Sequence, residues 1–265
     1  MILFNKKFKI GDNMDKECKI GIFDSGIGGA TVLKEIIKIL PKEDYIYYSD
    51  SINNPYGDKT EEEILNICDN IVKYFLKRNC KIIVVACNTA SAIAIEILRK
   101  RYSEIKFIGI EPAYKMVHDY NPQDETLIMA TNGTIKSEKF NKLYNKYNNN
   151  KTYLIPCIGL AEIIEEGNKE KINKYLKDNL EQYNNRVKNV VLGCTHYPII
   201  KNEISDVLGG VTFFEGSSRL AMHLKNVLEI QNLLNLNGTG NIEFIDSSNL
   251  KIKEKNFWNF LALSY

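Results

Sequence analysis

Two short stretches of the chain each carry a cysteine to the end of an apolar run. Cys87 follows the apolar residues 84–86, and Cys194 follows the run 190–193. Small residues with hydroxyl or amide groups come soon after each cysteine. Such runs predict buried strands, and ligands of α/β proteins bind at the carboxyl ends of their strands. Two thiols in matching contexts therefore predict a pair that faces one site from opposite sides.

A thiol at a strand end can act as a nucleophile or as an acid or base. Its pKa is about 8.5 in free cysteine, and the thiolate is favoured at the N-terminus of a helix. We expect a helix to begin just after Cys87, and Pro198 is compatible with a helix start just after Cys194. His196, two residues beyond Cys194, is a nearby titratable partner. We interpret the other two histidines as structural or surface residues.

The remaining cysteines have simpler interpretations. Cys68 lies in the apolar stripe of a predicted helix that begins with a capping box formed by Thr60 and Glu63, so we interpret it as a small core residue. Cys80 precedes a predicted strand and has the same interpretation. The six cysteines are too widely spaced for a Cys-x-x-Cys metal site, and no metal is predicted.

Composition predicts a globular chain of one large or two small domains. The 265 residues are 44% apolar and 26% charged, with a net charge of +2, which gives no reason to invoke nucleic acid or an anionic membrane. No apolar run approaches the roughly 18–20 residues that span a bilayer, and the N-terminus lacks the features of a signal peptide. We therefore predict a cytoplasmic protein with reduced thiols. Residues 1–16 are expected to be a disordered extension, with Met14 as the natural start.

Apolar periodicity predicts strands that alternate with helices. Strands are expected at residues 19–23, 45–48, 81–85, 107–110, 126–130, 152–155, 187–192 and 211–214. Helices are expected at residues 30–40, 60–76, 88–101, 160–166, 169–183 and 217–234, with another from a loop at 131–134 to about 147 and a last element ending near Trp258. This alternation predicts an α/β fold of mostly parallel sheets flanked by helices.

A weak internal echo suggests two similar halves. Residues 23–26, Phe-Asp-Ser-Gly, recur loosely at residues 214–217 as Phe-Glu-Gly-Ser, each after a short strand and before a helix. Together with the two cysteine stretches, the echo favours two similar domains with the active site in the cleft between them over one long sheet.

The glycine-rich turn at residues 26–29 does not favour a nucleotide. Its spacing is not Gly-x-Gly-x-x-Gly, it lacks the Gly-Lys of a P-loop, and Asp24 before it would repel a phosphate. Asp24 better suits a substrate ammonium group or a proton transfer. Polar residues at the predicted strand ends can hold the carboxylate and ammonium of a small amino acid, although these motifs contain no arginine clamp: Asp24, Ser25, Asp50, Tyr56, Asn88, Thr89, Thr134, Thr195 and His196.

Four motifs in order carry a family resemblance. Residues 21–29, residues 48–57, residues 85–91 and residues 192–198 together resemble the glutamate racemases, within the cofactor-independent aspartate/glutamate racemase superfamily, and the match extends over nearly the whole chain from about residue 19. The resemblance implies an isomerase that needs no cofactor, forms a homodimer and supplies D-glutamate for peptidoglycan. It also implies a discontinuous first domain of residues 17–110 plus 212–265 and a second domain of residues 111–211.

The resemblance further implies a two-base reaction. One thiolate removes the α-proton of glutamate and the other thiol protonates the opposite face, with Cys87 acting on D-glutamate and Cys194 on L-glutamate. Inverting a stereocentre in this way requires an acid and a base on opposite faces. Asp24 and His196 match the residues that assist the thiols, and Glu165 matches a further assisting carboxylate. The implied substrate contacts, with Thr134 added from the polar strand ends, are Asp24, Ser25, Tyr56, Gly57, Asn88, Thr89, Thr134, Thr195 and His196.

The chain departs from the family pattern in two places. Ile158 and Glu162 stand where the family often has proline, so the choice of Glu165 over Glu162 stays open. Residues 215–218 read Glu-Gly-Ser-Ser where the family usually has an Asp-Ser turn, which could alter the geometry of that loop.

Other functions also stay open from the sequence. Within the superfamily, the alternatives are an aspartate racemase or another diacid isomerase or decarboxylase. From other classes, a cysteine hydrolase would leave one cysteine motif unexplained, and a non-catalytic binding protein would tolerate the loss of both thiols.

Overall fold

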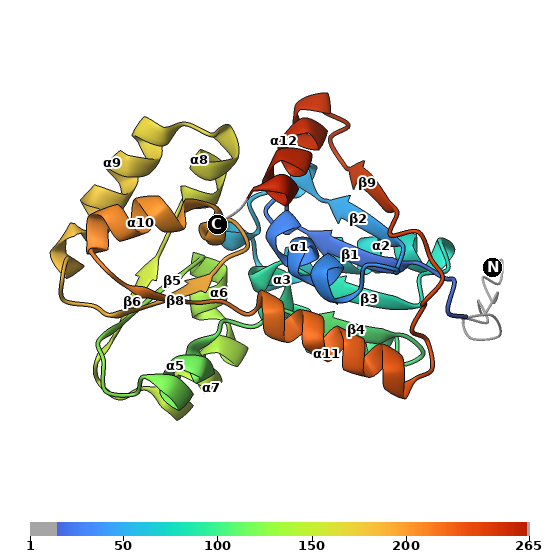
Figure 1. Ribbon diagram of the computed structural model, residues 1–265, viewed down its shortest axis with the longest axis horizontal. Helices are drawn as coiled ribbons and strands as arrows, with labels where there is room; N and C mark the ends of the chain where they lie inside the picture. The colour runs from blue at the N-terminus through green and yellow to red at the C-terminus, as the bar shows by residue number, and fades with distance from the viewer. Residues whose placement is uncertain (1–14, 264–265) are drawn as a thin grey trace.

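The computed structural model describes residues 15–263, which form two all-parallel sheets flanked by helices (Figure 1). The first sheet has the order β4-β3-β1-β2-β9 and the second the order β6-β5-β7-β8. We call each sheet with its helices the first and the second lobe. The strands of the first lobe are β1 (Ile20–Asp24), β2 (Tyr45–Ser49), β3 (Ile82–Val85), β4 (Lys106–Gly109) and β9 (Ile242–Asp246). Those of the second are β5 (Thr126–Ala130), β6 (Thr152–Pro156), β7 (Asn189–Gly193) and β8 (Thr212–Phe214).

Helices cover both sheets, as the predicted fold class requires. In the first lobe they are α1 (Ala30–Ile39), α2 (Glu61–Lys77), α3 (Asn88–Ile93), α4 (Ile95–Arg101), α11 (Ser217–Ile230) and α12 (Lys251–Ala262). In the second they are α5 (Tyr114–Tyr120), α6 (Asn132–Lys136), α7 (Glu138–Tyr147), α8 (Leu160–Glu166), α9 (Lys169–Leu180) and α10 (Lys201–Leu208). Short 3₁₀ turns are η1 (Ser51–Asn53), η2 (Tyr56–Asp58), η3 (Glu181–Tyr183) and η4 (Tyr197–Ile200). The predicted α/β fold class is confirmed.

The two lobes repeat one strand order. Numbering the first four strands of each lobe along the chain gives the order 2-1-3-4 in both sheets, and β9 is added beside β2 in the first. The strands that precede the two cysteines, β3 and β7, are therefore the third strand of their lobes. Because crossovers between parallel strands are right-handed, equal order gives equal architecture and places both thiols at equivalent strand ends.

The echo between residues 23–26 and residues 214–217 is not part of this repeat. Phe23 lies in β1, inside the first sheet, whereas Phe214 ends the edge strand β8. The chain after Phe214 returns to the first lobe, where α11 packs against α1 (Figure 1). The similar halves exist, but this short echo does not align them.

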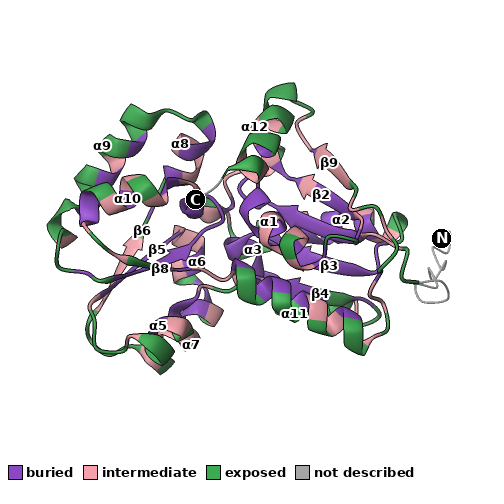
Figure 2. Ribbon diagram, in the orientation of Figure 1, coloured by how far each residue is buried: buried purple, intermediate pink, exposed green. Residues whose placement is uncertain are grey.

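Apolar packing explains why the central strands are buried and the helices amphipathic (Figure 2). Side chains of β1 and β3 alternate between two apolar clusters, one on each face of the first sheet, and β5 and β7 do the same in the second lobe. Each fully buried large apolar side chain contributes about 1.5–3 kcal/mol. The capping box of α2 forms as predicted: Thr60 Oγ1 accepts a hydrogen bond from the Glu63 backbone N–H at 3.2 Å, and the Glu63 carboxylate accepts one from the Thr60 N–H at 2.8 Å.

Several predicted elements were wrong in detail. The loop expected at residues 131–134 is the start of α6, because the Thr131 hydroxyl caps the helix by accepting from the Thr134 N–H at 3.2 Å. Helix α5 and strand β9 were not predicted. Strand β9 is a half-buried edge strand that carries Glu243 and Asp246, so its apolar pattern is weak. The helix expected at residues 88–101 divides at Ala94.

The ends of the chain and the domain boundaries are less fully described. The disordered extension predicted for residues 1–16 lies outside the described residues up to residue 14. Lys16 lies in a turn that the Cys18 N–H closes by donating to the Asp15 carbonyl at 3.3 Å, and the Lys81 ammonium donates to the Lys16 carbonyl at 2.6 Å. The predicted domain boundaries stay a prediction. Across residues 15–263, no helix has the length and apolarity needed to cross a bilayer.

Candidate active site between the lobes

A cavity lined by polar and apolar residues lies where the carboxyl ends of strands from both lobes meet. The empty space inside it, together with the open space at its mouth, is about 490 Å³. The first lobe lines it with Ser25, with residues 54–58 and with residues 87–89; the second adds Thr131, Asn132, residues 157–159, Ala161, Glu162 and residues 194–196. Both predicted cysteines are therefore on the wall of one cavity, each contributed by a different lobe.

Cys87 lies at the N-cap of α3, directly after β3. Its sulfur accepts a hydrogen bond from the Ala90 N–H at 3.5 Å and lies 3.7 Å from the Ser25 hydroxyl, to which the thiol can donate. The residue is 5% exposed. Burial, followed by the negative charge of Asp24, raises the pKa of the Cys87 thiol to about 12. At neutral pH the Cys87 side chain is therefore a protonated thiol.

Cys194 follows β7 and has a different set of neighbours. Its sulfur is 3.6 Å from His196 Nδ1, and the other ring nitrogen of His196 is 2.8 Å from Glu165 Oε1. The three side chains thus form a continuous line from thiol to imidazole to carboxylate. His196 and Glu165 are both buried, at 1% and 7% exposure.

Charge and burial oppose each other along this line. Burial by itself would lower the pKa of His196, but its contacts with Cys194 and Glu165 outweigh burial and raise that pKa well above its usual value. Burial would raise the pKa of Glu165, yet His196 and Lys253 lower it to about 2. The His196–Glu165 pair is therefore held as imidazolium and carboxylate, with an N–H available to face the Cys194 sulfur.

Asp24 ends β1 behind the cavity wall and is fully buried. Its carboxylate accepts hydrogen bonds from the Gly29 N–H at 2.9 Å and from the Thr195 hydroxyl at 3.3 Å. The Thr31 hydroxyl in turn donates to the Thr195 carbonyl at 2.9 Å. Burial raises the pKa of Asp24 above its ordinary value, although the positive charge of His196 opposes that rise. These bonds join the two lobes directly beneath the cavity.

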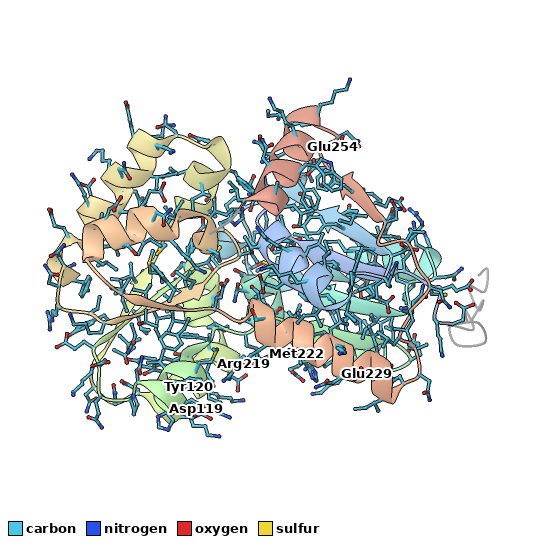
Figure 3. All side chains as sticks on the ribbon, viewed as in Figure 1. Asp119, Tyr120, Arg219, Met222, Glu229 and Glu254 are labelled. Atoms are coloured by element: carbon cyan, nitrogen blue, oxygen red, sulfur yellow. The ribbon has the colours of Figure 1, made fainter. Side chains whose placement is uncertain are left out.

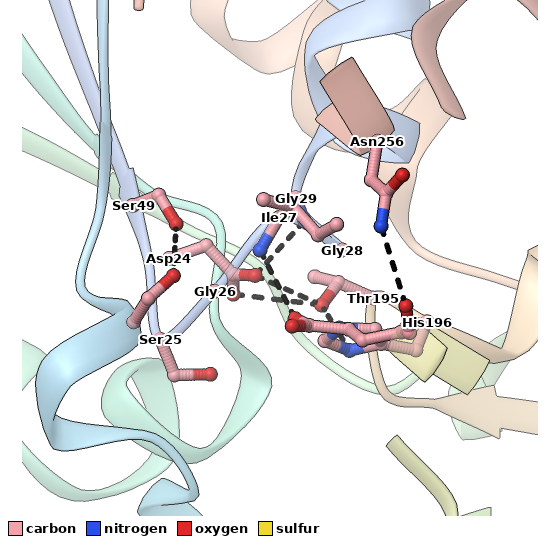
Figure 4. A network of polar contacts seen from close by, with 12 residues as sticks. Asp24, Ser25, Gly26, Ile27, Gly28, Gly29, Ser49, Thr195, His196 and Asn256 are labelled. Atoms are coloured by element: carbon pink, nitrogen blue, oxygen red, sulfur yellow. Dashed lines mark hydrogen bonds and ion pairs between the residues drawn. The ribbon is translucent and has the colours of Figure 1, made fainter. Parts of the chain in front are cut away.

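The glycine turn allows the lobes to approach this closely. A Cβ atom on Gly28 would come within 2.5 Å of the His196 ring, and one on Gly26 would overlap Glu165 Oε1. The Ile27 N–H between them donates to Glu165 Oε1 at 3.2 Å. Figure 4 shows Thr195 and His196 lying against this turn. Gly26 and Gly28 let the backbone of the first lobe contact the side chains of Glu165 and His196, and any larger residue would block this approach.

Asn88 is the clearest sign of a ligand site. Its side chain is buried at 3% exposure, and neither its amide nitrogen nor its amide oxygen has a hydrogen-bond partner. A buried amide without partners is rare and costly, so such groups commonly bind a ligand or water. Beside it, the Thr89 hydroxyl lies 2.8 Å from the Thr131 hydroxyl across the cavity floor.

Comparison with known proteins identifies the family. A family model described as Asp/Glu/Hydantoin racemase matches residues 20–223. The chain belongs to this racemase family. It is 44% identical over 242 residues to a glutamate racemase of Clostridium botulinum, covering 89% of this chain and 94% of the relative, and 45% identical over 222 residues to one of Clostridium novyi, covering 82% and 86%. The solved glutamate racemase of Francisella tularensis in complex with D-glutamate has a TM-score of 0.80 at 30% identity, covering 94% of this chain and 95% of that one.

Most of the predicted site residues come together in this family member. Seven lie on the cavity wall beside Cys87 and Cys194: Ser25, Tyr56, Gly57, Asn88, Thr89, Thr195 and His196. Asp24 lies behind the wall, and so does Thr134, whose hydroxyl contacts those of Thr89 and Thr131. Glu165 reaches His196 behind the wall, whereas Glu162 faces the cavity.

Some site residues were missed by the sequence prediction. Thr131 directly follows β5, as Ser25 directly follows β1, so the repeat itself could have located it. Asn132, the wall residues 157–159 and Lys253 had no comparable signal. The changed turn at Glu215 is outside the cavity wall and forms an ion pair with Lys201 at 2.7 Å. Among residues 15–263, no group of three or more His, Cys, Asp and Glu side chains could hold a metal ion.

Proposed function

We propose that this protein interconverts L- and D-glutamate by a two-base transfer of the α-proton between Cys194 and Cys87. The single observation that supports it most is the placement of two buried thiols at equivalent strand ends of two lobes, facing one cavity. A carbon atom bound between the sulfurs would meet an acid on one face and a base on the other. The relatives named glutamate racemase favour glutamate as the substrate.

The neighbours of each thiol suggest how the L-to-D direction begins. Cys194 acts as a thiolate whose sulfur faces the protonated Nδ1 of His196, 3.6 Å away, and it removes the α-proton of L-glutamate. Cys87, protonated because its pKa is raised to about 12, donates a proton to the opposite face. In the reverse direction the two thiols exchange roles. Asp24, whose pKa is raised, then assists the removal of the proton from Cys87 and its later return.

Substrate binding uses hydroxyl and amide groups. The unpartnered Asn88 amide can donate to a carboxylate and accept from an ammonium group, and the hydroxyls of Ser25, Thr89 and Thr195 are close to it on the wall. No lysine or arginine is among the described residues that line the wall, so His196 is the wall residue that carries a positive charge. Tyr56 is held in place on this wall because its hydroxyl donates to Asp50 at 2.6 Å.

The function is tested with purified protein and four substrates. L- and D-glutamate are expected to lose their optical activity, and in deuterated water the α-proton is expected to exchange with solvent. L- and D-aspartate measure the alternative within the family. No change in optical rotation of glutamate would sink the proposal, and faster racemisation of aspartate would reassign the substrate.

The proposal extends to the role of the product and to assembly. We infer a cytoplasmic homodimer that supplies D-glutamate for peptidoglycan. Expression of the protein in a bacterium that requires D-glutamate is expected to remove that requirement, and light scattering is expected to report twice the mass of the chain. Continued dependence on D-glutamate, or a monomeric mass, would contradict the respective part.

A further inference from the structure

Glu165 divides its two carboxylate oxygens between two positively charged groups. Oε1 accepts from His196 Nε2 at 2.8 Å and from the Ile27 N–H at 3.2 Å. Oε2 forms an ion pair with the ammonium of Lys253. The Glu165 side chain is 4% exposed, whereas that of Lys253 is 24% exposed. A buried carboxylate is costly without partners, and here each oxygen has its own partner. A rotation of the Glu165 carboxylate would break both sets of contacts, so its orientation is fixed.

Lys253 lies on a helix of the other lobe that is anchored by a buried aromatic side chain. It lies on α12 one turn before Phe257, which is fully buried and packs on Tyr47 and Phe244 with ring centroids 4.6 and 4.4 Å apart. Asn256 on the same helix has its amide 3.5 Å from the Glu165 carbonyl. Helix α12 therefore contacts Glu165 at both its side chain and its backbone.

The charge of Lys253 also limits what Glu165 can do for His196. Two cations share one carboxylate, so Lys253 lowers the preference of the ring for its protonated form while it keeps Glu165 ionised. Other titratable groups that act on this pair are Cys194, Asp24 of β1 and Tyr47 of β2. The ammonium of Lys253 is a cation outside the thiol–imidazole line that pairs directly with Glu165.

We propose that Lys253 is a positioning residue for the Cys194 half of the reaction: it holds Glu165 so that His196 Nδ1 faces the Cys194 sulfur, and it keeps the imidazole able to give its proton back. This inference rests on the proposed racemase function. It gives the C-terminal helix α12 a positioning role in catalysis, although this helix contributes no residue to the cavity wall.

The test replaces the ammonium and keeps the side-chain stem. Lys253→Met is expected to lower kcat/KM for glutamate at neutral pH about tenfold and to move both limbs of its pH profile upward by about one unit, because His196 and Glu165 each bind a proton more readily without the nearby cation. Lys253→Arg restores the charge and is expected to return both limbs. Lys255→Met, an exposed neighbour on the same helix, is the matched control and is expected to behave as wild type.

Two further measurements separate positioning from simple loss of structure. With α-deuterated substrates, Lys253→Met is expected to increase the isotope effect for L-glutamate and not for D-glutamate, because only the Cys194 step is slowed. Titration of the His196 ring by NMR is expected to move to higher pH in the same variant, and it needs no substrate. Should Lys253→Met fail to fold, Lys253→Gln provides the same comparison without the charge.

The outcomes are distinct for the two proposals. An unchanged pH profile and an unchanged His196 titration in a folded Lys253→Met or Lys253→Gln protein overturn the role of Lys253, and so does an arginine variant that stays at the methionine level. Wild-type protein without glutamate racemisation instead overturns the proposed function, while the NMR titration still decides whether Lys253 sets the protonation of His196.

Discussion

The two cysteines occupy equivalent strand ends but have opposite kinds of neighbours. Cys87 lies 3.7 Å from a neutral hydroxyl and within the negative field of Asp24, whereas Cys194 lies 3.6 Å from the imidazole of His196. The two lobes share one strand order, but the residues that surround the two thiols differ between the lobes. The difference gives each thiol its own assisting group, a carboxylate for Cys87 and an imidazole for Cys194, as a reaction with two separate acid/base groups requires.

The assisting groups also differ in how they are held. Asp24 is anchored from its own lobe by the Gly29 N–H and from the other lobe by Thr195. Glu165 belongs to the second lobe but is anchored by Ile27 and Lys253 of the first. Each side of the site therefore depends on contact between the lobes. Substitutions on either side are expected to disturb one thiol more than the other.

The largest effects are expected from the thiols themselves. Cys87→Ala and Cys194→Ala are each expected to lower racemisation by about 10³-fold or more, because each removes an acid or base that the other cannot replace. The residual chemistry should differ: Cys87→Ala is expected to exchange the α-proton of L-glutamate only, and Cys194→Ala that of D-glutamate only. Cys80→Ala, a core cysteine away from the cavity wall, is the control. Full racemisation by either variant would rule out the two-base mechanism.

Removal of the imidazole is expected to damage one side more than the other. His196→Asn should reduce kcat by about 10²–10³-fold with L-glutamate and less with D-glutamate, because Cys194 loses the cationic N–H that faces its thiolate. Steady-state rates in both directions measure this, since kcat can differ between directions while kcat/KM must agree for a reaction with an equilibrium constant of one. The exposed His223 of α11, replaced in the same way, is the control. Equal losses of kcat in the two directions would contradict the assignment of His196 to Cys194.

A smaller effect is expected from the glycine turn. Gly28→Ala places a methyl group 2.5 Å from the His196 ring, so the ring must move away from Cys194 or the lobes must separate. Activity is expected to fall about tenfold to a hundredfold, as for other displaced supporting groups. Gly210→Ala, where an added Cβ meets nothing within 4 Å, is expected to retain activity. An active Gly28→Ala enzyme would show that the close approach to His196 is not needed.

Stability should change with opposite sign at the two assisting carboxylates. The pKa of Glu165 is lowered from 4.5 to about 2, so its contribution is fully present above pH 4.5 and is lost as pH falls toward 2. Glu165→Gln is therefore expected to cost about 2 kcal/mol of unfolding free energy at pH 7 and to flatten the acid dependence. The pKa of Asp24 is raised, so the stability linked to its protonation is lost as pH rises, and Asp24→Asn is expected to make the protein more stable at pH 7 while slowing catalysis.

Urea unfolding at pH 3.5 and pH 7 measures both effects on stability. Exposed residues on the outer face of α11, such as Arg219, Met222 and Glu229 in Figure 3, offer neutral controls because they point away from both lobes' cores. If Asp24→Asn destabilises the protein at pH 7, the ionised Asp24 carboxylate does not carry the free-energy cost of burial that its raised pKa indicates.

Local sequence determined the fold class and the centre of the site. The apolar runs before Cys87 and Cys194 coincide with strands β3 and β7 to within two residues at each end. The ends of these strands, and the thiols that follow them, therefore result from local composition. The polar residues that follow these strands were predicted for the same reason. Strand β9 and helix α5 were missed because a half-buried edge strand and a short surface helix carry little apolar periodicity.

Only the tertiary structure decided between groups that the sequence left equivalent. Glu162 and Glu165 are one helical turn apart on α8, and which of them meets His196 depends on how the lobes pack against residues 26–28. Thr131, rather than Thr134, reaches the cavity because its hydroxyl caps α6 at the end of β5. The pairing of Lys253 with Glu165 joins residues 88 positions apart. Local sequence sets where a strand ends, whereas contacts between lobes depend on the packing of distant segments, and no local pattern records them.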